Sequence, residues 1–325
     1  MTRNASWPRG RFAPTPTGLL HLGNARTALA AWLSIRSRDG TFVWRLEDLD
    51  PPRTVPGMAA AAEEDLRWLG LDWDEGPDPV GGPFAPYEQS RRSALYEEAL
   101  EHLAAAGRLF PCRVSRADLA SLALAPHGRE GLPPYPPSLR PKDLPPDWFR
   151  TLREASTPDA ALRFRVDPEP VSFVDRIFGP IVERVGETVG DFVLQRRDGL
   201  FAYQLAVVAD DLAMGITEVV RGRDLLDSTA RQIQLIRALG GAPPDYAHLP
   251  LAVAATGAKI SKRERGLALR SLRERGVVPE AVVGLLASSL GLIDRPEPCR
   301  PRDLVPLFSW DKIPRQEWRL PAELF

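Results

Sequence analysis

Hydrophobic and polar positions near the N-terminus follow two different periods. Arg11 to Ala13 reads as the end of a short strand, and Thr41 to Leu46 is a run of aromatic and branched residues that is typical of another. Between them, Leu22 to Ser37 is rich in alanine and carries leucine and isoleucine at helical spacing. A strand, a helix and a strand in this order predict a parallel βαβ unit with a right-handed crossover.

The rest of the chain predicts further helices and short strands. Helices are expected over 57–70, 88–107 and Leu225–Leu239, and strands over Ala161–Val166, Val171–Val174, Val189–Gln195 and Leu200–Tyr203. Asp198-Gly199 predicts a tight turn that joins the last two strands into a hairpin. The many prolines within 126–147 predict an extended excursion. From about residue 246 we expect a smaller helical region with a polar loop at 256–266.

Composition narrows the class of protein without identifying it. The chain has 325 residues, of which 44% are hydrophobic and 26% charged, and its net charge is −1. These values are ordinary for a globular protein of about two to three domains. No apolar run approaches the roughly 18 to 20 residues of a membrane span. Met1 to Gly10 has no apolar signal core, so we expect a cytoplasmic protein with no membrane partner. Cys112 and Cys299 lie far apart and are expected to be inert thiols.

A first polar cluster, Pro14 to Asn24, lies where the first strand gives way to the helix. Backbone N–H groups at a helix N-terminus favour phosphate. His21 can donate to a phosphoryl oxygen, and Gly23 lets a nucleotide approach the backbone. A proline and glycine turn with a capping polar side chain explains the cluster equally well when it is taken alone.

A second polar cluster, Gly257 to Arg263, places Lys259 and Lys262 on either side of Ser261. Two ammonium groups can neutralise charge that builds on a transferring phosphate group. A solvated basic loop is the commoner explanation of such a segment by itself.

Together the two clusters resemble the signature motifs of class I aminoacyl-tRNA synthetases, "HIGH" and "KMSKS". Here they stand as His21-Leu22-Gly23-Asn24 and Lys259-Ile260-Ser261-Lys262-Arg263, with Asn24 and Ile260 as mild departures. The resemblance implies catalytic roles for His21, Lys259 and Lys262. It also implies an ATP site, with Mg²⁺ accompanying the nucleotide, made of Pro14, His21, Gly23, Asn24, Lys259, Ser261 and Lys262.

Further blocks resemble the catalytic core of glutamyl-tRNA synthetases, in family order: Arg11 to Gly18, Arg45 to Asp50, Asp198 to Ala206, Asp210-Asp211, Val220 to Asp224 and His248 to Leu251. The resemblance implies that the glutamate pocket is lined by Arg11, Phe12, Ala13, Pro14, Thr15, Glu47, Tyr203 and Arg221. A guanidinium suits the carboxylates of glutamate, and Glu47 suits its ammonium. Taken singly, Glu47 could instead pair with Arg45, and Tyr203 could be a core residue.

Phe325 follows soon after the second motif, which leaves too few residues for an anticodon-reading region. The pattern therefore resembles the glutamyl-Q tRNA(Asp) synthetases. This resemblance implies that L-glutamate is activated with ATP to glutamyl-adenylate and transferred to queuosine in the anticodon loop of tRNA(Asp). One alternative is a truncated glutamyl-tRNA synthetase that charges a tRNA 3′ end, which the length disfavours. Another is a non-catalytic RNA-binding relic, which is disfavoured because both phosphate-handling clusters are kept.

The resemblance also implies an architecture: an α/β fold with a Rossmann-like doubly wound parallel sheet, an inserted α+β segment and a small helical C-terminal region. We expect the first half of the nucleotide-binding domain at 1–97, the insert at 98–188, the second half at 189–245 and a stem-contact-like region at 246–325. Nothing in the sequence demands more than a monomer.

One family feature, a zinc motif in the insert, is degraded. Family members place Cys-x-Cys, a tyrosine and a further cysteine around the metal. Here Cys112 and Tyr135 remain, while Val114 and Leu139 stand where the other two thiolates would be. Because one thiolate and one phenol cannot complete a four-ligand site, we predict no zinc.

Overall fold

The structure is a computed structural model that describes residues 7–77, 79–114, 134–154, 159–254, 257 and 267–321. A six-stranded sheet at its centre has the order β2-β1-β8-β9-β5-β6. The strands are β1 (Arg9–Phe12), β2 (Thr41–Trp44), β5 (Val171–Asp175), β6 (Gly179–Glu183), β8 (Glu218–Gly222) and β9 (Asp245–Leu249). Neighbouring strands are parallel except β6, which is antiparallel to β5 at the edge. The predicted N-terminal βαβ unit is confirmed.

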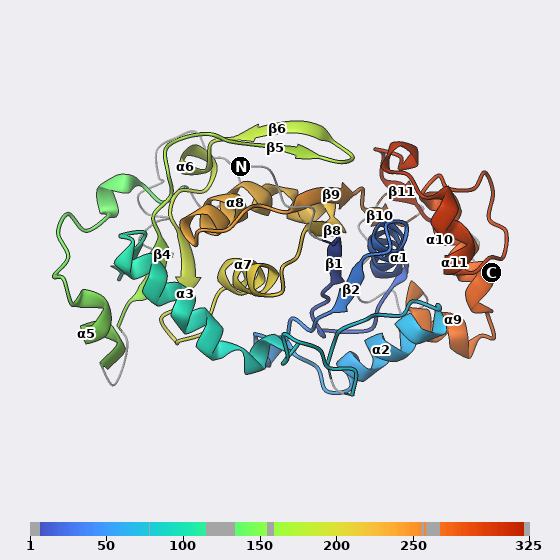
Figure 1. Cartoon of the computed structure of the whole chain (residues 1–325), viewed down its shortest axis with the longest axis horizontal. Coiled ribbons are helices and arrows are strands. Elements are labelled where there is room, and N and C mark those ends of the chain that lie inside the picture. The colour runs from blue at the N-terminus through green and yellow to red at the C-terminus, as the bar shows by residue number, and fades with distance from the viewer. Residues whose placement is uncertain are drawn as a thin grey trace.

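Helix α1 (Leu22–Arg36) joins β1 to β2 and packs closely on β1. A Cβ atom on Gly10 would lie 2.5 Å from Cγ1 of Ile35, so glycine is what allows this close approach. Helix α7 (Tyr203–Ala213) lies on the other side of β1 and β2 (Figure 1). Helices on both faces of a mainly parallel sheet make a doubly wound, Rossmann-like α/β fold, which confirms the predicted fold class.

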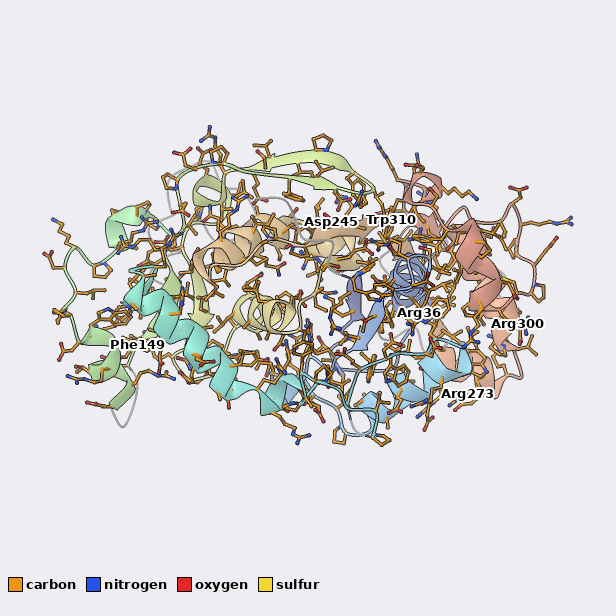
Figure 2. The ribbon with its side chains drawn as sticks, in the orientation of Figure 1. Arg36, Phe149, Asp245, Arg273, Arg300 and Trp310 are labelled. Carbon is orange, nitrogen blue, oxygen red and sulfur yellow. The ribbon has the colours of Figure 1, made fainter. Side chains whose placement is uncertain are left out.

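A second, antiparallel sheet has the order β3-β4-β7. It consists of β3 (Leu109–Cys112), β4 (Ala161–Phe164) and β7 (Phe192–Gln195). Beside it lie α3 (Ser93–Ala105), α5 (Trp148–Glu154) and α6 (Val185–Thr188), on the left in Figure 1. Figure 2 places Phe149 of α5 and Arg300, just before α11 (Pro301–Leu304), at opposite ends of the long axis.

Strand pairing cuts across the expected boundary at residues 188 and 189. Strands β5 and β6, expected in the insert, pair at the edge of the main sheet, whereas β7, expected in the second half of the nucleotide-binding domain, pairs with β4. Between β4 and β8 the chain passes three times between the two sheets. Local alternation of apolar residues predicts a strand but not the sheet it joins, because pairing is a long-range choice.

Two predicted elements are wrong in part. The second hairpin strand, Leu200–Tyr203, is reduced to a single bridge between Phe201 and Gln195, and α7 already begins at Tyr203. The helical spacing of the buried residues from Leu205 onward outweighs the strand signal there. The predicted helix Leu225–Leu239 divides into a 3₁₀ segment, η4 (Arg223–Ser228), and α8 (Thr229–Ala238).

The C-terminal region packs against α1. Its elements are α9 (Leu269–Glu274), α10 (Pro279–Ser289), α11 and the two-stranded pairing of β10 (Ala252–Val253) with β11 (Trp318–Arg319). Helix α2 (Met58–Trp68) lies beside α9 (Figure 1). Short 3₁₀ segments occur at η1 (Pro51–Arg53), η2 (Gln89–Arg91), η3 (Pro137–Leu139), η6 (Val305–Leu307) and η7 (Trp310–Lys312). Among the described residues, no helix is long and apolar enough to cross a membrane.

Candidate active site

A cavity opens where β1, β8 and β9 end and α1 begins. It brings together ten of the residues predicted for ATP or glutamate: Arg11, Phe12, Ala13, Pro14, His21, Gly23, Asn24, Glu47, Tyr203 and Arg221. The carboxyl ends of parallel strands are the usual ligand side of such a sheet. Thr15 is exposed and lies outside this lining, contrary to its predicted place in the pocket, because the proline-rich turn carries it to the surface. Lys259, Ser261 and Lys262 lie outside the described residues.

His21 is the N-cap of α1. Its Nδ1 accepts hydrogen bonds from the backbone N–H groups of Gly23 (3.1 Å) and Asn24 (3.4 Å), and Asn24 Oδ1 accepts from the His21 N–H at 3.1 Å. The capping interpretation of the first cluster is therefore confirmed. These capping hydrogen bonds involve Nδ1 and do not exclude a chemical role for Nε2. With Nδ1 as the acceptor, the neutral ring carries its proton on Nε2, which is a donor.

The backbone of His21 also connects the two signature motifs. His21 forms a bridge with Ala268, and the N–H of Leu269 donates to the carbonyl of Leu20 at 2.9 Å. Ala268 and Leu269 follow the second motif and begin α9. The chain on the C-terminal side of the second motif is thus anchored at the entrance of α1.

Buried ion pairs lie behind the wall of the cavity that Arg11 and Glu47 line. Arg45 Nη1 donates to Asp211 Oδ1 at 2.7 Å, and Arg11 Nε donates to the same oxygen at 3.2 Å. Burial opposes ionisation of Asp211, but Arg11 and Arg45 outweigh it and lower the pKa of that carboxyl. Asp211 therefore balances the charge of Arg11. The sequence placed Asp211 in a family block without giving it a role.

Glu47 joins this wall through Arg45, whose Nη2 lies 3.3 Å from Glu47 Oε1. The pairing interpretation of Glu47 and Arg45 is therefore confirmed, and Glu47 still lines the cavity. Burial raises the pKa of Glu47, while Arg45 and Arg11 act against the rise. Tyr203 faces the same cavity from the start of α7. Burial, with a smaller effect of Glu47, raises the pKa of the Tyr203 phenol and keeps it protonated as a donor.

Arg221 lies on β8 and is held only by neutral acceptors. It donates to His248 Nε2 at 2.9 Å, to Gln232 Oε1 at 2.7 Å and to Thr229 Oγ1 at 2.9 Å. No described carboxylate lies within ion-pair distance of this guanidinium, although Arg221 is 5% exposed. Arg11 is paired with the carboxylate of Asp211. Arg221, which also lines the cavity, has no carboxylate partner among the described residues.

Arg26 lines the cavity as well and was missed by the sequence analysis. It is 2% exposed and donates to the carbonyl of Pro250 at 2.7 Å and to Ser289 Oγ at 3.0 Å. Its guanidinium lies over the ring of Trp318, 5.7 Å from the centroid. Burial lowers the pKa of Arg26 to about 10. An arginine within an otherwise apolar, alanine-rich helix is the signal that could have revealed it.

The degraded zinc motif forms a small cluster in the insert. Cys112 and Tyr135 are buried together, and Val114 and Leu139 pack against them. Arg163 donates from Nε to Cys112 Sγ at 3.3 Å and lies over the Tyr135 ring at 4.3 Å. The Cys112 thiol itself lies 3.5 Å from the Tyr135 hydroxyl, and the guanidinium of Arg163 is a cationic neighbour of both. One thiolate and one phenol do not make a closed four-ligand zinc site, so Cys112 and Tyr135 alone do not fit one.

Comparisons with known proteins agree with this geometry. The family model "tRNA synthetases class I (E and Q), catalytic domain" matches residues 9–292. A glutamyl-Q tRNA(Asp) synthetase of Symbiobacterium thermophilum is 54% identical, with 97% of this chain and 96% of that protein aligned. The one from Nitratidesulfovibrio vulgaris is 46% identical, with 97% and 96% aligned.

A glutamate tRNA ligase of Elizabethkingia meningosepticum, crystallised in complex with its amino acid, superimposes with a TM-score of 0.84 at 30% identity. The superposition covers 98% of this chain and 68% of that one. The family model, the doubly wound sheet and the near full-length similarity all agree, and the chain belongs to the class I tRNA synthetases, in the glutamyl-Q tRNA(Asp) synthetase family.

Proposed function

We propose that the chain activates L-glutamate with ATP and transfers the glutamyl group to queuosine in the anticodon loop of tRNA(Asp). The names of the relatives and the family motifs support the reaction. The observation that carries it is a single cavity with His21 and Gly23 at the helix entrance and Arg221 and Glu47 further along its wall. Such a cavity offers neighbouring places for a phosphate chain and for a charged amino acid.

Glutamate carries two carboxylates and one ammonium, and the cavity offers partners of opposite charge. Arg221 has no acidic partner among the described residues and binds a carboxylate in this proposal. Glu47 and the Tyr203 hydroxyl receive the ammonium. Arg11, with Phe12, Ala13 and Pro14, completes the pocket. Thr15 is not included, because it lies outside the lining.

ATP occupies the end of the cavity nearest α1. Pro14, His21, Gly23 and Asn24 line that end, and Lys259, Ser261 and Lys262 are assigned to it from the second motif. A Cβ atom on Gly23 would lie 3.0 Å from the His21 ring, so a larger residue would crowd the ring against the nucleotide. Mg²⁺ accompanies ATP and neutralises its phosphate oxygens. The described residues offer no cluster of acids for a separate metal cage.

The reaction has two steps. A carboxylate oxygen of glutamate attacks the α-phosphorus of ATP, the bond to the β-phosphate oxygen breaks, and pyrophosphate leaves. A hydroxyl oxygen of queuosine then attacks the activated carbonyl carbon, AMP leaves, and the hydroxyl proton is released. The chain contributes orientation and charge stabilisation, with His21 Nε2–H and the two lysines facing the developing phosphate charge.

The proposal extends to setting and organisation. The enzyme acts as a monomer in the cytoplasm, with glutamate, ATP and queuosine-containing tRNA(Asp) as its partners. The two parts of the nucleotide-binding domain bind ATP and glutamate. The insert and the C-terminal region lie at either side of that domain and contact the RNA.

Labelled glutamate and ATP, offered with tRNA(Asp) that contains or lacks queuosine, test the proposal. Label on the queuosine-containing RNA alone is expected. Equal label on both RNAs would indicate charging of a 3′ end by a truncated synthetase. Label on neither RNA, together with no glutamate-dependent ATP–pyrophosphate exchange, would indicate a non-catalytic RNA-binding relic.

A further inference from the structure

Three neighbouring strands of the main sheet contribute a buried chain of side chains behind the cavity. Asp175 ends β5, His248 lies on β9 and Arg221 lies on β8. Asp175 Oδ2 is 2.6 Å from His248 Nδ1, and His248 Nε2 accepts from Arg221 Nε at 2.9 Å. The side chains of Asp175 and His248 are completely buried. Of the three, Arg221 alone lines the cavity.

The direction of each hydrogen bond follows from the neighbours of Asp175. Its Oδ1 accepts from the backbone N–H groups of Ile177 (3.0 Å) and Phe178 (2.9 Å), and its Oδ2 accepts from the His248 N–H at 3.1 Å. These donors fix an acceptor opposite His248 Nδ1, so the ring proton lies on Nδ1. Burial lowers the pKa of His248 and keeps the ring neutral. The Nε2 lone pair therefore faces Arg221.

In this arrangement the carboxylate of Asp175 balances the charge of Arg221 without accepting hydrogen bonds from the Arg221 N–H groups. A guanidinium has five N–H donors. A direct carboxylate partner would balance the charge of Arg221 but would take the N–H groups that a substrate carboxylate needs, as Asp211 does for Arg11 at 3.2 Å. Asp175 supplies its charge from the far side of the imidazole ring. Arg221 spends only three hydrogen bonds on the protein, all to neutral acceptors.

We propose that the Asp175–His248 pair is a positioning device for Arg221, which orients its guanidinium and balances its charge while leaving donors for a carboxylate of the substrate. The inference rests on the proposed function, since it assigns that carboxylate to glutamate. It makes Asp175 and His248 determinants of specificity for glutamate over glutamine. Neither side chain lines the cavity, so they act through Arg221.

The substitution Asp175→Asn tests the pair most directly. Asparagine keeps an oxygen for the N–H groups of Ile177 and Phe178, but its amide group presents a donor to His248. The imidazole proton must then move to Nε2, where it opposes the Arg221 N–H; loss of the correct tautomer is the known effect of this exchange in a catalytic triad. We expect KM for glutamate to rise about 10- to 100-fold in ATP–pyrophosphate exchange, with KM for ATP within about twofold.

Three further variants distinguish the loss of Arg221 orientation from a general loss of folding stability. Asp191→Asn is the matched control, because Asp191 is equally buried but lies beside the β3-β4-β7 sheet, where it pairs with Arg140 at 2.7 Å. It should leave KM for glutamate unchanged. His248→Gln keeps an acceptor for Arg221 and an N–H for Asp175, so it should retain most of the affinity for glutamate. His248→Leu keeps neither and should resemble Asp175→Asn. The preference in kcat/KM for glutamate over glutamine should fall in parallel with the loss of affinity.

The outcomes are distinguishable. A folded Asp175→Asn protein with unchanged KM for glutamate would overturn the inference, and so would an equal rise of both KM values. If Asp175→Asn proves unstable in thermal unfolding, the comparison of His248→Gln with His248→Leu decides the same question. Failure of the unmodified enzyme to activate glutamate would overturn the proposed function itself, and the inference with it.

Discussion

The guanidinium of Arg26 donates a 2.7 Å hydrogen bond to the carbonyl of Pro250, which joins the helix of the first signature motif to the segment that leads into the second. Pro250 precedes β10, and β10 pairs with β11, whose Trp318 lies under the same guanidinium. Ser289 Oγ ties the C-terminal helix α10 to this point. One buried cation therefore holds three parts of the chain around the end of the cavity that we propose binds ATP.

Replacing Arg26 by methionine should weaken both the fold and ATP binding. The change leaves the buried carbonyl of Pro250 and the part-buried carbonyl of Ser289 without their Arg26 donor, which costs roughly 1–3 kcal/mol in the free energy of unfolding. KM for ATP should rise, because Pro250 and Ala252 line the cavity. Urea unfolding and ATP–pyrophosphate exchange measure the two effects. Arg237→Met, on the exposed face of α8, is the control and should change stability by less than about 0.5 kcal/mol.

Contacts between residues far apart in the chain explain which site residues the sequence analysis missed. His21, Glu47 and Arg221 were found because they belong to short motifs. Arg26 belongs to no quoted block, and its acceptor Pro250 lies 224 positions away in the chain. Asp175 was likewise missed, because nothing local connects the end of one strand to a histidine that lies 73 positions further along the chain.

Prediction of the fold from the sequence was limited in the same way, by contacts between distant segments. The N-terminal βαβ unit was predicted well because its signals are local, namely apolar periodicity and turn residues. The sheet membership of β5, β6 and β7 was not, since all three read as short strands and only long-range pairing distinguishes them. The start of α7 at Tyr203 was missed because a four-residue apolar run fits a strand and a buried helix equally well.

Asp65 on α2 gives a prediction about pH. Both of its carboxylate oxygens are buried with no hydrogen-bond partner among the described residues. Burial raises the pKa of Asp65 to about 6, although Arg273 and Arg270 of α9 act against the rise. Arg273 lies where α2 and α9 meet (Figure 2) and pairs with Glu64 at 3.1 Å rather than with Asp65.

The sign follows from proton linkage. The folded state holds the Asp65 proton more tightly than the unfolded state, so this residue costs stability as pH rises from about 4 through 6. Asp65→Leu should therefore gain stability relative to the unmodified protein by about 2 kcal/mol more at pH 7 than at pH 4. Urea unfolding at both pH values measures the difference. A gain that is the same at both would show that the pKa of Asp65 is not raised in the folded state.

The insert gives a prediction about metal. Cys112, Tyr135 and Arg163 leave no closed zinc site, so the purified protein should contain far less than one zinc per chain. The triple variant Val114→Cys, Leu139→Cys and Arg163→Gln restores two thiolates and removes the competing cation. It should bind about one zinc. The same variant with serine at 114 and 139 is the control and should bind none, and one zinc in the unmodified protein would refute the prediction.

His21 combines two roles that substitutions can separate. Its Nδ1 caps α1 through Gly23 and Asn24, while its Nε2–H is the group assigned to the phosphates of ATP. Asparagine is a good N-cap but has no donor at the position of Nε2. His21→Asn should therefore keep the melting temperature and lose about 10²-fold in kcat for ATP–pyrophosphate exchange, whereas His21→Ala should lose both activity and about 1 kcal/mol of stability.

Thr27 provides the matched control for His21, because it lines the same cavity nearly two turns further along α1 and its hydroxyl donates to the Gly23 carbonyl at 3.1 Å. Thr27→Ala should alter kcat little. If His21→Asn keeps full activity, the histidine is a cap and nothing more, and phosphate chemistry must rest on the lysines of the second motif. If His21→Asn loses stability as well as activity, the two roles are not separable, and the loss of activity follows from displacement of α1.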